Sequence, residues 1–321
     1  MSDAALYTVA WICVIVTSLV VGCQFLGTRR SSTPPTRPSK ASRKPQFWRI
    51  QGIEKSAEAC AREWIERVSP QYSSLAENDS RELCATVTTF DKPEKPDWAR
   101  NVEQRFQGIT PLSSPTEAEV DIIAVTGLSG HALGSFRSSN GQYTWLRDDL
   151  PKRLPKARIL TYGYDTTLHG SQHKESIRGL AKVFLDTITS FRRATKTQAR
   201  PICLIGHSLG GVVLKEALAM SHETSDKESH AIILCTYGLV LLGVPNLGLR
   251  HPQLAMLVKG QPNQQFIQDL GVDEDESPSP YLSELTIKFS RVCSTTNPPF
   301  HIVSYFETER TPTVKVSLLL L

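Results

Sequence analysis

A serine between glycines is the clearest candidate for chemistry in this 321-residue chain. The segment reads Gly206-His207-Ser208-Leu209-Gly210 and matches the pattern G-x-S-x-G. Such a pattern places a serine hydroxyl on a sharp turn between a strand and a helix, where it can attack a carbonyl carbon. The first amides of the helix then point at the place where an oxyanion would form. We therefore expect Ser208 to be a nucleophile and the Leu209 amide to bind the oxyanion.

The flanking residues have the patterns that such a turn requires. Residues 202–205 form a short apolar run, which is typical of a buried parallel strand. The residues after the turn are apolar at helical spacing: Leu209, Val212, Val213, Ala217 and Met220. Glycines leave room for the tight turn because they carry no side chain. This context favours a nucleophile turn over a Ser-Gly turn that merely joins a strand to a helix.

A second glycine-rich loop follows the predicted strand at 120–125 and begins at Thr126. In hydrolases with a serine on such a turn, a loop after an early strand supplies the other amide of the oxyanion hole. We expect the Leu128 amide to converge with that of Leu209 on one oxygen. Gly127 and His131 of this loop are expected to line the pocket. A flexible turn with no role in binding is the alternative.

A serine nucleophile needs a base, and the usual chain order is serine, then a carboxylate, then histidine. We predict Glu307, at the end of the predicted strand 301–307, as the acid, with Glu309 as the second choice. The prediction rests on topology, and a surface carboxylate is the alternative. The base is harder to assign because no histidine follows His301, and His301 begins its strand at the wrong end for the site.

The other histidines and one asparagine complete the candidate site. His207 lies inside the turn, and its ring is expected to face away from the outlet of the serine hydroxyl. His131 and His251 could lie near the pocket, but either would act as a base out of the usual order. Asn246 ends the predicted buried strand 238–246 and is a further pocket candidate. We predict no metal and no cofactor; the acidic run 273–276 is more typical of a solvated loop.

Strands alternate with helices from residue 118 onward, which predicts a doubly wound, mostly parallel sheet over 118–321. Within it, 247–289 reads as loops and short helices above the sheet, where a lid would lie. A β-α-β-β order over 46–92 predicts a small α+β module. The Pro-rich stretch 93–117 is expected to be a linker with a helix at 98–106.

The N-terminal segment predicts a membrane anchor. Residues 6–26 carry no charge, and roughly 20 apolar residues suffice to cross a bilayer as a helix. Basic residues follow in a Pro/Ser-rich linker at 28–45, which favours an uncleaved anchor at 1–27 with the C-terminal part in the cytosol. A cleaved signal or transit peptide is the alternative. The linker could rest on anionic lipid or serve only as a spacer.

Composition argues against nucleic acid as a partner. The net charge is +4, but six basic residues of the linker account for it, and the remainder is near neutral. The predicted module lacks the paired aromatics of an RNA-recognition strand. None of the seven cysteines forms a C-x-x-C pair, which indicates reduced thiols and a reducing compartment.

Five phrases of the chain carry a resemblance to known proteins: 120–128, 157–165, 206–211, 243–246 and 305–308. In these phrases the chain resembles a fungal group of α/β-hydrolase-like proteins. That group is related to the mitochondrial protein called "serine active site containing". It is more distantly similar to GPI inositol-deacylases and lipase-like serine esterases. The resemblance implies an α/β-hydrolase fold and ester hydrolysis or acyl transfer on lipids at mitochondrial or endoplasmic-reticulum membranes.

The resembled proteins place their histidine in a loop well after the last predicted strand. The apolar tail 314–321 is also unusual for a finished domain. We therefore expect the hydrolase domain to be incomplete at its C-terminus and this chain to lack the base. The leading prediction is a membrane-anchored, lipase- or esterase-like serine hydrolase with a membrane lipid or acyl-ester substrate. The alternative is a non-catalytic binding or scaffold protein of the same fold.

Overall fold

The computed structural model describes residues 44–306, except 139–140, 166–174, 251, 274 and 276. The predicted anchor at 1–27, most of the linker at 28–45, His251 and Glu307 lie outside the described residues. In the part that the structure describes, no helix is both long and apolar enough to cross a membrane.

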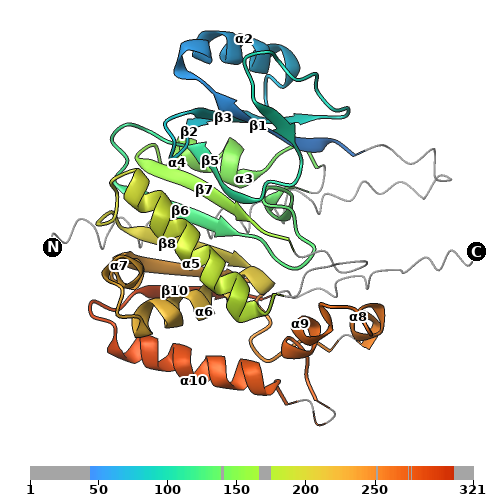
Figure 1. Cartoon of the computed structure of the whole chain (residues 1–321), viewed down its shortest axis with the longest axis vertical. Coiled ribbons are helices and arrows are strands. Elements are labelled where there is room, and N and C mark those ends of the chain that lie inside the picture. Colours follow the sequence, from blue (N-terminus) through green and yellow to red (C-terminus); the bar gives the residue numbers. More distant parts are fainter. Residues whose placement is uncertain are drawn as a thin grey trace, which may run out of the picture.

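A six-stranded sheet forms the centre of the molecule, in the order β10-β9-β8-β6-β7-β5 (Figure 1). Its strands are β5 (Gly108–Ser113), β6 (Val120–Val125), β7 (Ala157–Gly163), β8 (Ile202–His207), β9 (Thr236–Leu242) and β10 (His301–Tyr305). All neighbours pair in parallel except β5, which runs antiparallel to β7. The prediction of a mostly parallel sheet is confirmed.

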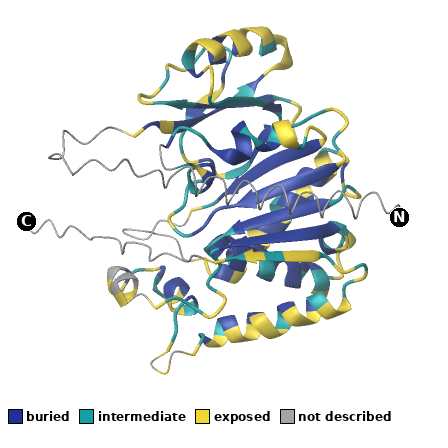
Figure 2. Ribbon diagram, turned by 180° about the vertical axis from the view of Figure 1, so that it is seen from behind, coloured by how far each residue is buried: buried dark blue, intermediate teal, exposed yellow. Residues whose placement is uncertain are grey.

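Both faces of this sheet are buried, because side chains alternate between two separate cores (Figure 2). Ile123 and Val125 of β6 pack in the core that contains α5 (Ile177–Ala194) and α6 (Leu209–Glu223). Ile122 and Ala124 pack in the other core. That second core is closed by η2 (Gly134–Phe136), α3 (Trp145–Asp148) and α4 (Leu150–Arg153). The fold is therefore doubly wound, as an α/β-hydrolase fold requires.

The direction of strand addition reverses between β6 and β8. The chain passes from β6 to β7 on one side and then returns through α5 to β8 on the other side. Ligands of open α/β sheets bind at such a switch point, outside the carboxyl ends of the strands. Val125 and Gly206 are paired across the two strands at this end. The residues that follow them, Thr126 and His207, therefore open the two loops that flank the switch point.

A small antiparallel sheet precedes this domain, in the order β2-β3-β1-β4. Its elements are β1 (Gln46–Ile53), η1 (Lys55–Ala57), α2 (Glu58–Val68), β2 (Ser73–Glu77), β3 (Leu83–Thr89) and β4 (Asn101–Glu103). The predicted β-α-β-β order is present over 46–92. However, 93–117 contains β4 and β5 instead of a linker with a helix at 98–106, because β4 pairs with β1 and β5 pairs with β7.

The small module packs beside β5 at one edge of the large sheet (Figure 1). Arg49 of β1 donates hydrogen bonds to the Thr110 hydroxyl at 2.7 Å and to the Gln107 carbonyl at 2.9 Å. Phe47 of the same strand is buried in the core of the large domain. The two parts therefore share both a polar and an apolar contact.

The segment 247–289 contains α8 (Pro252–Leu257), α9 (Gln264–Asp269) and the start of α10 (Pro280–Thr295). The prediction of loops and short helices holds up to α10, which is longer than expected. Its start is well defined, because the Ser279 hydroxyl accepts a hydrogen bond from the Leu282 amide and Pro280 occupies the first turn. Another short helix, α7 (Lys227–Cys235), precedes β9.

Candidate active site

Ser208 lies between β8 and α6 in a backbone conformation that is unusual for a residue with a side chain. Its φ is 51° and its ψ is −125°. Strained conformations of this kind persist only where the surroundings enforce them, and they cluster at functional sites. The Ser208 amide donates to the Leu242 carbonyl of β9 at 2.8 Å, and its carbonyl accepts from Gly211 at 3.0 Å. The turn is thus held from both sides, and the Ser208 side chain is only half-buried.

The glycines of the motif are required by close contacts. A Cβ added to Gly206 would lie 2.5 Å from the Gly211 Cα. A Cβ added to Gly210 would lie 2.4 Å from the carbonyl oxygens of both Val125 and Thr126. The start of α6 can therefore lie directly against the end of β6 only because no side chain intervenes.

The loop after β6 touches Ser208. A Cβ added to Gly127 would lie 2.8 Å from the Ser208 Cβ and 3.0 Å from the His207 carbonyl oxygen. The loop turns at Ser129, whose φ is 50°, and the Gly130 amide donates to the Gly127 carbonyl at 3.0 Å. The two segments predicted to form an oxyanion hole are therefore neighbours in space.

The amides of Leu128 and Leu209 make no hydrogen bond to another residue that the structure describes. Leu209 is the first residue of α6, where amides have no acceptor within the helix. Their convergence on one oxygen stays a prediction, and both amides are compatible with it.

Tyr164, which sequence reasoning missed, fixes the base of this loop. Its hydroxyl donates to the Thr126 carbonyl at 2.8 Å. Burial raises the pKa of the Tyr164 hydroxyl, so it remains a protonated donor at neutral pH. Tyr164 directly follows β7, but nothing in the local sequence indicates which distant carbonyl its hydroxyl would reach.

An apolar cavity of about 810 Å³ adjoins the loop. Leu128 forms part of its wall, and most of the remainder comes from the segment above the sheet, including Leu249, Ile267, Leu270 and Val272. A cavity of this size can bury most of a small organic ligand. Since Leu128 follows the glycine that touches Ser208, an ester bound at Ser208 could extend an apolar chain into this cavity.

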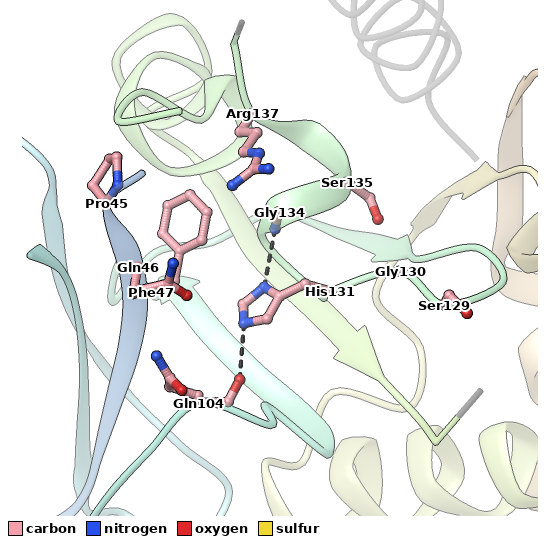
Figure 3. Close-up of a pocket in the computed structure, with 10 residues that line it drawn as sticks. All are labelled: Pro45, Gln46, Phe47, Gln104, Ser129, Gly130, His131, Gly134, Ser135 and Arg137. Carbon is pink, nitrogen blue, oxygen red and sulfur yellow. Dashed lines mark hydrogen bonds between the residues drawn. The ribbon is translucent and has the colours of Figure 1, made fainter. Parts of the chain in front are cut away.

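His131 is engaged elsewhere. Its Nδ1 accepts from the amides of Leu133 and Gly134 at 3.1 and 3.0 Å, so Nε2 carries the proton and donates to the Gln104 carbonyl at 2.9 Å (Figure 3). Burial lowers the pKa of His131, which keeps the ring neutral. His131 does line a pocket, but that pocket faces the small module and does not include Ser208. With both nitrogens bonded, the ring is not positioned as a base for Ser208.

The remaining candidates lie as follows. The His207 ring packs edge-to-face with Phe136, with 6.2 Å between ring centroids. His301 starts β10 at the opposite end of the sheet, as predicted. Asn246 accepts a hydrogen bond from Lys215 of α6. Glu307 lies outside the described residues. The strand before it ends at Tyr305, which pairs with Leu242 at the end of the sheet where Ser208 lies.

Among the described residues, no cluster of three or more metal-ligating side chains is found.

Comparison with known protein families points to the same region. Residues 122–272, which include both loops and Ser208, match the family model described as "Putative serine esterase (DUF676)". The central region is similar to serine esterases. The predicted resemblance to lipase-like serine esterases is confirmed by this family match. The narrower resemblance to a fungal group stays a prediction.

Among curated proteins, the chain is 28% identical over 216 residues to Protein SERAC1 from Mus musculus, covering 62% of this chain and 31% of that protein. It is 27% identical over 217 residues to Protein SERAC1 from Homo sapiens, covering 61% of this chain and 31% of that protein. The chain therefore spans about a third of the length of these relatives.

Two solved structures of lipolytic enzymes are also similar. Phospholipase PlaB from Legionella pneumophila has a TM-score of 0.42 at 14% identity, with 58% of this chain and 39% of that chain covered. The mature lipase BlEst2 from Bacillus licheniformis has a TM-score of 0.35 at 16% identity, with 55% of this chain and 62% of that chain covered.

Proposed function

We propose that this chain is a serine hydrolase that cleaves acyl esters, with Ser208 as the nucleophile. One observation carries the proposal. Ser208 is held at a positive φ on the turn after β8, at the switch point of the sheet, with the glycine-rich loop after β6 in contact with its Cβ. This is the context in which a G-x-S-x-G match corresponds to a nucleophile turn.

In the proposed reaction, the Ser208 Oγ attacks the acyl carbonyl carbon while its proton passes to a base. The carbonyl oxygen becomes an oxyanion, which the amides of Leu128 and Leu209 stabilise by roughly 3 kcal/mol each. Collapse of this intermediate breaks the ester C–O bond, and the alcohol leaves with a proton. Water then attacks the acyl-enzyme, which releases the carboxylic acid and restores the serine.

A carboxylate and a histidine base belong to the proposed machinery, and no histidine among the described residues is assigned as that base. Glu307 is the proposed acid. It follows the strand that ends at Tyr305, and Tyr305 lies at the carboxyl end of the sheet, where Ser208 also lies. Its role is to orient the imidazole of a histidine base. His131 does not serve as this base, because both of its nitrogens are bonded.

The apolar cavity behind Leu128 is the proposed site for the acyl chain. We expect hydrolysis of p-nitrophenyl octanoate to exceed that of the acetate in kcat/KM, because burial contributes about 0.8 kcal/mol per methylene. Val272→Trp should remove this preference by filling the cavity, while acetate hydrolysis is retained. An unchanged preference in Val272→Trp would place the acyl chain elsewhere.

A membrane lipid is the proposed source of the ester. The apolar cavity and the uncharged segment 6–26 both support it. We propose that 1–27 anchors the chain in a mitochondrial or endoplasmic-reticulum membrane, with the folded part on the cytosolic side.

A non-catalytic binding or scaffold protein is the second candidate. The hydrogen bonds of both His131 nitrogens favour this second function, because they give the histidine of the loop after β6 a structural role. Such a protein would keep the apolar cavity and bind lipid without turnover. Covalent labelling of Ser208 separates the two functions.

A further inference from the structure

A second cavity lies where the small module meets the large domain, and the His131 side chain forms part of its wall (Figure 3). Its volume is about 400 Å³. Pro45, Gln46 and Phe47 of the module form one side, and Gln104 closes it next to β4. Residues of the loop after β6, from Ser129 to Arg137, form the opposite side. The cavity therefore exists only because the two parts of the chain are docked.

Among the described residues, the charge on the cavity lining is positive. Arg137 is its one charged lining residue, and its guanidinium turns toward Phe47 in Figure 3. Arg137 forms no ion pair with any residue that the structure describes. The carboxylate of nearby Glu103 is already bonded to Arg49 and to the amides of Arg105 and Phe106. Exposed Arg137 therefore has no acidic partner among the residues that the structure describes.

The remaining lining groups suit an anion with several oxygens. The side-chain amides of Gln46 and Gln104 are the neutral donors of the lining, although one N–H of Gln46 already donates to the Lys44 carbonyl at 3.2 Å. The stacked rings of Phe47 and His131, 5.5 Å apart, form an apolar wall. Exposed Lys44, the last basic residue of the linker, directly precedes Pro45 of the lining. A guanidinium with several neutral donors matches a phosphate group better than a carboxylate, which has fewer oxygens to satisfy.

We propose that this junction cavity binds the phosphate group of a small phosphate monoester, with Arg137 as its main ligand and Gln46 and Gln104 as additional donors. The organic part of the ligand lies against the Phe47 and His131 rings. The site is separate from Ser208, so its occupancy does not depend on whether the proposed hydrolysis takes place.

The test is calorimetric titration of the purified full chain in detergent with sn-glycerol 3-phosphate. We expect saturable binding with a Kd of about 1 mM or tighter, and none with glycerol. Arg137→Gln should weaken binding by at least about tenfold, since a hydrogen-bonded charge pair is lost. Gln46→Ala should weaken it less. Arg291→Gln, at an exposed arginine of α10, is the matched control and should bind like the native chain. Ser208→Ala should also bind like the native chain.

Two further ligands sharpen the outcome. Tighter binding of dihexanoyl phosphatidic acid than of glycerol 3-phosphate would identify a lipid head group as the natural source, and the reverse order would identify a soluble ester. Either order supports the site if Arg137→Gln weakens the binding of both ligands by at least about tenfold. Absence of saturable binding, equal binding in Arg137→Gln, or equal affinity for glycerate would overturn the proposal.

Discussion

At the scale of single residues, a few contacts hold backbone groups in place around Ser208. Ser208 adopts a positive φ, Gly127 touches its Cβ, and the Tyr164 hydroxyl binds the Thr126 carbonyl at the start of the loop. Ser208 and its glycines could be predicted from sequence because their motif is local. Tyr164 and the bonding of His131 could not, because each depends on a partner 27 to 38 residues away.

Tyr164→Phe tests whether the loop position matters for chemistry. The substitution leaves the buried Thr126 carbonyl without its donor, and a loss of about 1–3 kcal/mol is typical of such a change. We expect the reaction of Ser208 with a fluorophosphonate to slow about tenfold while the fold is retained. Tyr162→Phe is the matched control, since Tyr162 stacks on Tyr164 and its hydroxyl is hydrogen-bonded to Thr187 of α5. Equal rates in both variants would show that the tyrosine contact is only structural.

His131 predicts a dependence of stability on pH. Burial lowers its folded-state pKa below the unfolded value near 6.5, so the unfolded chain binds a proton more readily. The contribution of His131 is therefore present above about pH 6.5 and is lost as pH falls toward the folded pKa, by at most about 1.4 kcal/mol per pH unit. Glu103, Arg137 and Arg49 are the charged groups that act on the ring.

Urea unfolding of the native chain and of His131→Gln at about pH 7.5 and 5.5 measures this dependence. The variant should lose less stability between the two pH values than the native chain. His301→Gln, at an exposed histidine, should behave like the native chain. A His131→Gln variant with the full native pH dependence would contradict the assignment.

At the scale of elements, strands β6, β7 and β8 are tied together at the end of the sheet opposite Ser208. Asp121 of β6 is fully buried and pairs with Arg158 of β7, Arg192 of α5 and Arg200 before β8. These pairs fix the relative register of the strands whose other ends carry the two loops of the site.

Asp121→Asn should therefore destabilise the fold strongly. Removal of one charge of a buried network leaves the others uncompensated and costs about 3–5 kcal/mol. Glu119→Gln, which breaks an exposed pair with Lys156, should cost no more than about 1 kcal/mol. Urea unfolding at neutral pH compares the two. A cost below about 1 kcal/mol for Asp121→Asn would mean that the network does not stabilise the sheet.

The elements themselves were predictable where their patterns were long or strongly apolar. The predicted strand 120–125 has the same bounds as β6, and the apolar run 202–205 lies within β8. β5 was missed because Pro111 and a register shift interrupt it, as edge strands tolerate. β4 has only three residues and forms through its pairing with β1, which no local pattern reveals. The apolar spacing of α10, at Leu282, Leu285, Phe289 and Val292, would have predicted a helix.

At the scale of the whole molecule, the chain combines an α/β-hydrolase-like domain and a docked small module with a proposed membrane anchor. Deletion of 2–27 should release the protein into the supernatant after alkaline carbonate extraction of membranes, while the full chain stays in the pellet. An anchored protein also resists high salt, whereas a protein held only by its basic linker is released. Full release of the complete chain by carbonate would contradict the anchor.

The central claim is that Ser208 is a nucleophile presented to an oxyanion hole, and covalent labelling tests it most directly. The purified full chain is treated with a fluorophosphonate and analysed by intact mass and peptide mapping. We predict one adduct per chain, located on Ser208, that is absent in Ser208→Ala and retained in the control Ser294→Ala, at an exposed serine of α10. An unlabelled native chain, or an adduct that persists in Ser208→Ala, would contradict the account.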